Sequence, residues 1–284
     1  MINTTILSYV TFIYFIAFCF YLLFIVMRRP PLGMLGTLSL AGGIVLQTIV
    51  LIMRWVESYQ IEIGYGGHAP LSNLYESLIF FSWTIAIIYF VIELRLKNKA
   101  IGAFILPVTF LLMAYASFSP GISDQIKPLV PALQSNWLIS HVMTCFLGYA
   151  AFAVSFSLSV MYLLKYKNAH SINKILKIFP ERDALDILNY QVILIGLLML
   201  TLGIITGSVW AHNAWGTYWS WDPKETWSLI TWLVYAIILH TRFSRGWDGK
   251  RIAIMSIIGF CCVLFTYLGV NFLLAGLHSY GSSI

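Results

Sequence analysis

The apolar residues of this chain fall into long, nearly uninterrupted blocks, and polar residues are concentrated in the segments between them. A block of about 20 apolar residues is long enough to cross a bilayer as a helix, whereas a strand of a membrane barrel needs only about ten residues. In lipid, each spanning segment must satisfy its backbone hydrogen bonds internally. The pattern predicts an all-α, polytopic membrane helical bundle with about eight transmembrane helices. We expect these helices at 6–27, 35–54, 74–94, 101–118, 136–164, 187–209, 223–241 and 252–275.

The composition agrees with this pattern. The chain is 60% hydrophobic and 10% charged, with a mean hydropathy of +0.83, whereas a soluble domain carries roughly 25% charged residues. No basic segment precedes the first block, which runs to Met27 before it meets Arg28 and Arg29. We therefore expect it to remain as a membrane span rather than be cleaved as a signal peptide. With no internal repeat in view, 1–284 is predicted to be a single integral membrane domain.

Basic residues divide the connections between the blocks into two alternating sets. All Lys and Arg residues except Arg54, Lys127 and Lys224 lie in the first set. The first set is 28–34, 95–100, 165–186 and 242–251, and the second is 55–73, 119–135, 210–222 and the C-terminal tail. Since Lys and Arg accumulate on the cytoplasmic side, we expect the first set inside and the second set, with both termini, outside. The net charge of +6 then reflects membrane orientation, and we expect no nucleic-acid partner.

The cysteines carry no recognisable chemistry. Cys19, Cys145, Cys261 and Cys262 all lie within apolar blocks, without a CxxC motif or a metal-ligand spacing. Free cysteine is commonly a small buried apolar residue. We therefore predict neither a disulfide nor a catalytic thiol, and we assign no catalytic residue to the chain.

The most distinctive segment is rich in tryptophan. Five of the ten tryptophans lie within Trp210–Trp227, interleaved with Gly, Ser, Asp and Pro. Asp222, Pro223 and Glu225 have the pattern of the N-cap, N1 and N3 positions of the following helix. A membrane-interface belt of aromatic residues is the alternative, but a belt needs only one or two aromatics per helix end. The pattern favours an outward-facing loop that stacks on a large, flat, apolar ligand, although helix capping is the default role of Asp222.

Two histidines are predicted beside this loop. His141 opens the fifth predicted helix and His278 follows the eighth, both on the outer side. Two neutral imidazoles that approach a flat cofactor from opposite faces describe bis-histidine haem ligation. His240 lies 18 residues beyond Asp222, or about 27 Å along a helix, which places it near the inner boundary of the hydrocarbon. There it is either a functional ionisable group or an interfacial cap next to Arg242.

Four further polar residues have simpler interpretations. His68 is expected to be a surface or turn residue of an outer loop, and His170 a surface residue of an inner one. His212 lies within the tryptophan-rich segment but ranks below His141 as a ligand. Arg54 either pairs with a haem propionate or anchors the second helix at the interface.

These segments resemble a known family. Trp215–Trp227 is similar to the WWD signature of a superfamily of haem-handling proteins, here a loop at approximately 209–227. Three other segments resemble the CcsA (ResC) family of system II cytochrome c biogenesis proteins in particular. They are Gly67–Ser77, Pro131–His141 and Gly269–Gly281. The resemblance covers the chain from Arg54 onward, and eight helices in 284 residues fit this family.

The resemblance implies specific site residues. His141 and His278 would be the axial metal ligands of haem b (iron protoporphyrin IX) in the ferrous state, and His240 would ligate haem in transit. A CcsB-type membrane partner would supply the counterpart of His240. The remaining haem-binding residues would be Trp215, Trp219, Trp221, Asp222 and Trp227. His212 departs from the family pattern, where we expect a different residue.

The implied function is that of the membrane subunit of a cytochrome c synthetase, a haem lyase complex. It would carry haem across the bacterial cytoplasmic membrane or the thylakoid membrane and present it for thioether attachment to the CxxCH motif of apocytochrome c. Thiol-reducing proteins would act indirectly, on the cysteines of that motif. A haem transporter or chaperone is the main alternative, because neither role requires an internal acid or base. A bis-histidine quinol oxidoreductase would usually carry paired histidines on single helices, and no predicted helix has two.

Overall fold

The computed structural model describes residues 2–61, 67–168 and 176–274, and all regular secondary structure in these ranges is helical. Its long helices are α1 (Ile2–Met27), α2 (Pro30–Ile61), α3 (Leu74–Leu96), α4 (Gly102–Phe118), α5 (Asn136–Lys167), α6 (Arg182–Trp215), α7 (Pro223–Arg245) and α8 (Gly249–Leu264). Short 3-10 turns are η1 (Lys99–Ile101) and η2 (Pro131–Leu133), and α8 continues through the π-helical η3 (Phe265–Gly269) into α9 (Val270–Leu273). No strand occurs in these described ranges, which confirms the predicted all-α class.

Among the described residues, seven helices are long and apolar enough to cross a membrane, with α8, η3 and α9 acting as one. The chain is therefore an integral membrane protein. The helix outside this group is α7, which the sequence also predicts to be a span. It is less apolar because Lys224, Glu225 and Thr226 occupy its first turn, and Arg242 and Arg245 occupy its last.

Two helices extend well beyond the predicted ends. Helix α2 runs to Ile61, and α6 continues through the first half of the tryptophan-rich segment to Trp215. Gly216 ends α6 in the left-handed conformation, with φ of +82° and its N–H donating to the carbonyl of His212 at 2.9 Å. Glycine adopts this conformation without steric cost. The predicted loop at 209–227 is thus reduced to 216–222, between two helices.

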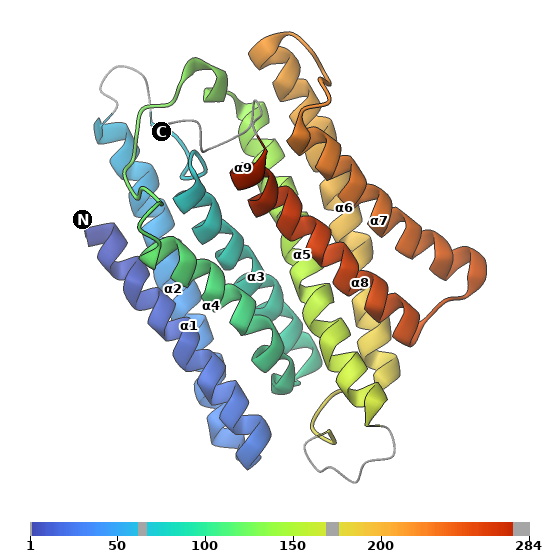
Figure 1. The fold of residues 1–284 in the computed structure, drawn as a ribbon. Helices are drawn as coiled ribbons and strands as arrows, with labels where there is room; N and C mark the ends of the chain where they lie inside the picture. Colours follow the sequence, from blue (N-terminus) through green and yellow to red (C-terminus); the bar gives the residue numbers. More distant parts are fainter. Residues whose placement is uncertain (1, 62–66, 169–175, 275–284) are drawn as a thin grey trace. The chain divides into compact units, whose positions relative to one another are not determined.

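The chain divides into two compact units. Unit 1 contains Met1–Val130 and His170–Pro180, and unit 2 contains Pro131–Ala169 and Glu181–Ile284. In unit 1, α1 packs against α2 and α4, and α3 packs against α4 (Figure 1). Its core includes buried Gln47, which accepts a hydrogen bond from Tyr14 at 2.5 Å and donates to Ser82 at 2.9 Å. The single predicted domain stays a prediction.

In unit 2, α5 packs along α6 and also contacts α8, while α7 contacts both α6 and α8. Small residues permit the close approach of α5 and α6: a Cβ added to Gly148 would stand 3.0 Å from the carbonyl oxygen of Gly196. Such glycine contacts are typical of helix pairs in membranes, where backbones pack closely. Further along the same pair, buried Ser155 donates to Asn189 at 2.6 Å.

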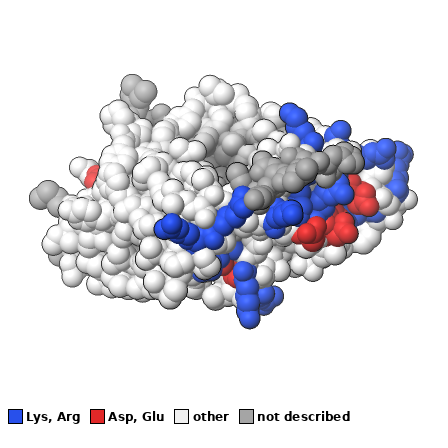
Figure 2. Space-filling model, turned by 90° about the horizontal axis from the view of Figure 1, so that it is seen from below, with Lys and Arg blue, Asp and Glu red and all other residues white. Residues whose placement is uncertain are grey.

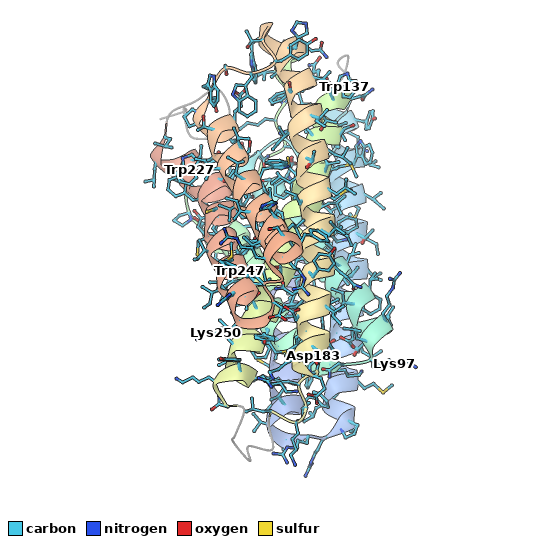
Figure 3. The ribbon with its side chains drawn as sticks, turned by 90° about the vertical axis from the view of Figure 1, so that its right-hand side faces the viewer. Lys97, Trp137, Asp183, Trp227, Trp247 and Lys250 are labelled. Atoms are coloured by element: carbon cyan, nitrogen blue, oxygen red, sulfur yellow. The ribbon has the colours of Figure 1, made fainter. Side chains whose placement is uncertain are left out.

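One end of unit 2 gathers basic side chains. Arg242 of α7 forms a two-bond ion pair with Asp186 of α6, at 2.6 and 3.1 Å. Lys250 of α8 lies 5.4 Å from the ring centre of Tyr166, at the end of α5. Figure 2 shows Lys and Arg side chains gathered on the face seen from below. In Figure 3, Trp227 lies away from Lys250, toward the opposite end.

Candidate functional site

The start of α7 is stabilised by the side chains of its N-cap residue Asp222 and its third residue Glu225. The carboxylate of Asp222 accepts a hydrogen bond from the backbone N–H of Lys224 at 2.9 Å, and that of Glu225 accepts from the N–H of Asp222 at 3.3 Å. This reciprocal arrangement is the capping box that the sequence predicts. Glu225 also accepts from the N–H of Ser220 at 2.8 Å and from its hydroxyl at 3.3 Å. One carboxylate therefore organises the turn that precedes the helix.

This turn holds Trp221 in an unusual conformation. Its φ is +60°, in the left-handed region, and its side chain is 68% exposed. For a bulky L-residue this conformation costs roughly 1–2 kcal/mol. The hydroxyl of Thr226 donates to the carbonyl of Trp221 at 3.2 Å, so that the strained residue is fixed on both sides. Strain of this kind is concentrated at functional sites.

His141 is fixed at the end of unit 2 where α5 begins. Its Nδ1 lies 2.7 Å from the carbonyl oxygen of Gly203 on α6. A carbonyl oxygen only accepts hydrogen bonds, so that Nδ1 must carry the proton. In the neutral imidazole the lone pair then resides on Nε2, the usual state of a histidine that ligates a metal.

Two tryptophans of α6 form a series of ring contacts that begins at His141. The imidazole stacks on Trp210, with ring centres 6.0 Å apart and planes inclined by 18°. Trp210 in turn meets Trp215 edge-on at 4.9 Å, and its indole N–H donates to the carbonyl of Ala132 at 2.8 Å. The structure thus places His141 against Trp210, which in turn contacts Trp215.

The other predicted tryptophans form separate contacts. Trp219 meets Trp221 edge-on at 5.7 Å. Trp227 packs at 4.2 Å on Phe265, the first residue of the π-helical η3. The hydroxyl of Thr266 donates to the carbonyl of Trp227 at 3.2 Å, so that η3 joins the start of α7 to the last part of α8. Turns of π-helix are rare and often occur at functional sites.

The remaining predicted ligands lie elsewhere. His278 falls outside the described residues, as does His170. His240 lies near the basic end of unit 2, two residues before Arg242, and is exposed. It shares one stripe of α7 with exposed Leu233 and Ile237, spaced four and three residues apart. A histidine on an apolar helix face is consistent with contact to lipid or to another membrane helix.

Arg54 and His68 in unit 1 are buried, unlike the expectation for each. Arg54 pairs with Glu76 at 2.9 Å, and the two side chains are 2% and 1% exposed. The guanidinium also donates to the carbonyl of Asp124 at 3.0 Å. The imidazole nitrogens of His68 lie 3.1 Å from the carbonyl oxygen of Ala69 and 3.2 Å from that of Lys127. Arg54 is therefore an internal ion-pair partner, and the expectation that His68 is a surface residue is wrong.

His212 is exposed, and its ring stacks on exposed Tyr218 with centres 4.2 Å apart and planes 6° from parallel.

The supports of His141 were not identified from the sequence. They are Gly203, whose carbonyl oxygen meets Nδ1, Gly207, which faces the imidazole, and Trp210, on which it stacks. The available signal was the GxxxG spacing of the two glycines, which in an apolar helix indicates close packing of a neighbouring helix.

The geometry around His141 fits a porphyrin-bound iron. Its fixed tautomer supplies one nitrogen donor, and the neighbouring indoles supply flat apolar surfaces.

The comparisons with known proteins agree on one family. The sequence profile described as "Cytochrome C assembly protein" matches residues 71–278. A "Cytochrome c biogenesis protein CcsA" from Chlamydomonas reinhardtii is 46% identical over 240 residues, which cover 83% of this chain and 65% of that protein. Proteins of the same description from a strain of Prochlorococcus marinus and from Trieres chinensis are 43% and 40% identical. They match over 85% and 88% of this chain, and over 82% and 87% of their own lengths.

A solved structure shows a similar fold. The chain matches "Cytochrome c Heme Lyase CcmF" with a TM-score of 0.67 over 94% of its length, covering 46% of that protein. The sequence identity is 16%, so that this likeness concerns the fold alone.

Proposed function

The chain belongs to the CcsA family of cytochrome c biogenesis proteins, and from this premise we propose that it is the haem-handling membrane subunit of a cytochrome c synthetase. In this role it carries haem b, in the ferrous state, across the membrane. It presents the haem at the tryptophan-rich end of unit 2 for attachment to apocytochrome c. Haem is the substrate of the complex, and the protein supplies its position and electronic environment.

The observation that carries this proposal is the state of His141. The bond from Nδ1–H to the carbonyl of Gly203, at 2.7 Å, leaves the lone pair on Nε2 and orients the ring. A histidine that serves only as an interfacial residue needs no such orientation. His141 is thus the first axial ligand in the proposal.

His278 provides the second axial ligand. It follows α9, which η3 connects to α8, and Lys224 of α7 donates to Asn271 of α9 at 3.1 Å. This bond ties α9, which precedes His278 in the chain, to the start of α7 beside the tryptophan-rich turn. The indoles of Trp215, Trp219, Trp221 and Trp227, with Asp222 as the helix cap, would line the haem.

His240 serves haem in transit. Its exposed position on an apolar stripe of α7 makes it accessible to a second membrane protein, which we propose is a CcsB-type partner that supplies the opposing ligand. The basic end of unit 2, near His240, is the cytoplasmic side by the distribution of Lys and Arg. The tryptophan-rich end then faces the outside of a bacterial cytoplasmic membrane or the lumen of a thylakoid.

The chemistry at the outer end needs no acid or base from this chain. Each cysteine thiol of the CxxCH motif adds across one vinyl group, so that a carbon–sulfur bond forms and the thiol hydrogen passes to the other vinyl carbon. Atoms balance and no external oxidant is consumed. Thiol-reducing proteins act beforehand by keeping the two cysteines reduced.

The experiment is to purify the full chain in detergent with haem and compare His141→Ala, His278→Ala and His240→Ala with a His170→Ala control. We expect both outer variants to lose haem or change its absorption spectrum, with recovery upon addition of imidazole, while the control retains the wild-type spectrum. Unchanged haem content and spectrum in either outer variant would contradict the proposed site.

Covalent attachment separates a synthetase from a delivery protein. Reconstitution with a CcsB-type partner and an apocytochrome should yield haem that stays bound to the cytochrome after denaturation. If haem reaches the apocytochrome but no thioether forms under reducing conditions, the chain is a transporter or chaperone instead.

A further inference from the structure

One face of α6 is shaped around the ring of His141. A Cβ added to Gly207 would stand 2.4 Å from Nδ1 and 2.6 Å from Cε1 of the imidazole. Real Cβ atoms do not approach other atoms so closely, and hence any residue other than glycine at 207 would displace the ring. Gly203, one helical turn earlier, offers its carbonyl oxygen to the same Nδ1.

The third contact comes from Trp210, which stacks on the imidazole. The indole is itself buried and tied to Ala132 by its N–H at 2.8 Å, so that it forms a fixed wall. The ring of His141 is therefore confined by a close glycine, a carbonyl at Nδ1 and an indole against one face. All three contacts come from residues of α6 within two helical turns.

We propose that Gly203, Gly207 and Trp210 are positioning residues that present Nε2 of His141 to the haem iron and strengthen it as a donor. This inference rests on the proposed function and goes beyond it, because it concerns how this ligand is held. A histidine that donates Nδ1–H to a carbonyl is a more basic ligand. The bond should therefore favour the oxidised iron and lower the reduction potential of the bound haem.

The helix pair offers a matched control for the steric change. A Cβ added to Gly196, on the same helix, would stand 2.5 Å from the ring of Phe152 on α5. Gly196→Ala thus stresses the same interface about as severely as Gly207→Ala, but about three helical turns before Gly207. An effect of helix packing alone would appear in both variants.

The experiment compares wild type, Gly207→Ala, Gly196→Ala and His141→Ala in the purified full chain. For Gly207→Ala we expect roughly tenfold or greater loss of haem affinity, the size usual for removal of a ligand's supporting contacts. Haem that remains should show a raised reduction potential and a changed spectrum, and added imidazole should restore the low-spin spectrum. Gly196→Ala should keep the wild-type spectrum and potential, whatever its thermal stability.

Nitrogen NMR of histidine-labelled protein without haem gives a second readout. We expect the His141 signal to report Nδ1–H in wild type and in Gly196→Ala, and to lose that signature in Gly207→Ala. If Gly207→Ala binds haem with wild-type affinity and potential while His141→Ala does not, the positioning role is refuted and the ligand assignment survives. If His141→Ala itself has no effect, the proposed function fails first. A wild-type signal from Nε2–H would also overturn the inference.

Discussion

Replacement of Glu225 by alanine should release the turn that presents Trp221. Glu225 is the shared acceptor of two backbone N–H groups and one hydroxyl, from Ser220 and Asp222, at 2.8 to 3.3 Å. Without this carboxylate, both neighbours of the left-handed Trp221 lose the bonds that hold them, and the hydrogen bond from Thr226 to the carbonyl of Trp221 remains. We therefore expect the turn to relax and the indole to leave its position.

The magnitude follows from the bonds and the strain. Hydrogen bonds to a charged group contribute about 1.5–3 kcal/mol when protected from water. Because the turn is largely exposed, we take about 2 kcal/mol for the whole set. Relief of the strain at Trp221, roughly 1–2 kcal/mol, also favours the relaxed turn once these hydrogen bonds are lost. A loss of about 2 kcal/mol changes the population of the native turn by up to about 30-fold.

Hydrogen–deuterium exchange measures this change directly. In Glu225→Ala, the amides of Ser220 and Asp222 should exchange about 10- to 30-fold faster than in wild type, and haem affinity should fall. Glu181→Ala is the control, since Glu181 stands before α6 without a side-chain cap bond, and its 87% exposed side chain pairs with Lys165. Equal exchange rates in Glu225→Ala and wild type would refute the reasoning.

Three further predictions concern the scaffold. Arg54→Met should lower the unfolding free energy by about 3–5 kcal/mol because it leaves Glu76 buried and unpaired. The double variant Arg54→Met with Glu76→Met should recover most of this loss in thermal melts. Equal melting temperatures of the single and double variants would contradict this. Asp186→Asn weakens both bonds to Arg242 and should increase protease cleavage at the basic end of α7, without changing the haem spectrum at the outer site. Unaltered cleavage would show that the Arg242–Asp186 ion pair does not stabilise this end of the helix. Gly249→Ala would place a Cβ 2.3 Å from the hydroxyl of Tyr162 at a residue whose φ is +52°. The melting temperature of this variant should fall by several degrees, and an unchanged melting temperature would contradict the predicted strain.

The helices could be predicted from the sequence because the bilayer imposes a length and an apolar character on each. The ends were harder to predict. Helix α6 continues to Trp215 because tryptophan and histidine are compatible with a helix, and only Gly216 provides a definite stop. Helix α7 was recognised from Asp222 and Pro223, which mark a helix start by local chemistry.

The site was predictable in its residue types but not in its supports. Tryptophans and histidines are rare enough to attract notice, so that His141 and the aromatic segment could be proposed together. The burial of Arg54 against Glu76 depends on contact between α2 and α3, which the sequence pattern within either segment cannot predict. The role of Gly207 similarly depends on the register of α5 against α6, because a glycine alone does not specify which side chain faces it.

The most direct test of the central claim is to exchange the proposed ligand. In His141→Cys, haem bound to the purified chain should show the magnetic circular dichroism of histidine–thiolate ligation when oxidised, in place of the bis-histidine signature of wild type. A bis-histidine spectrum that persists in His141→Cys, with haem content unchanged, would show that His141 is not an iron ligand and would contradict the account.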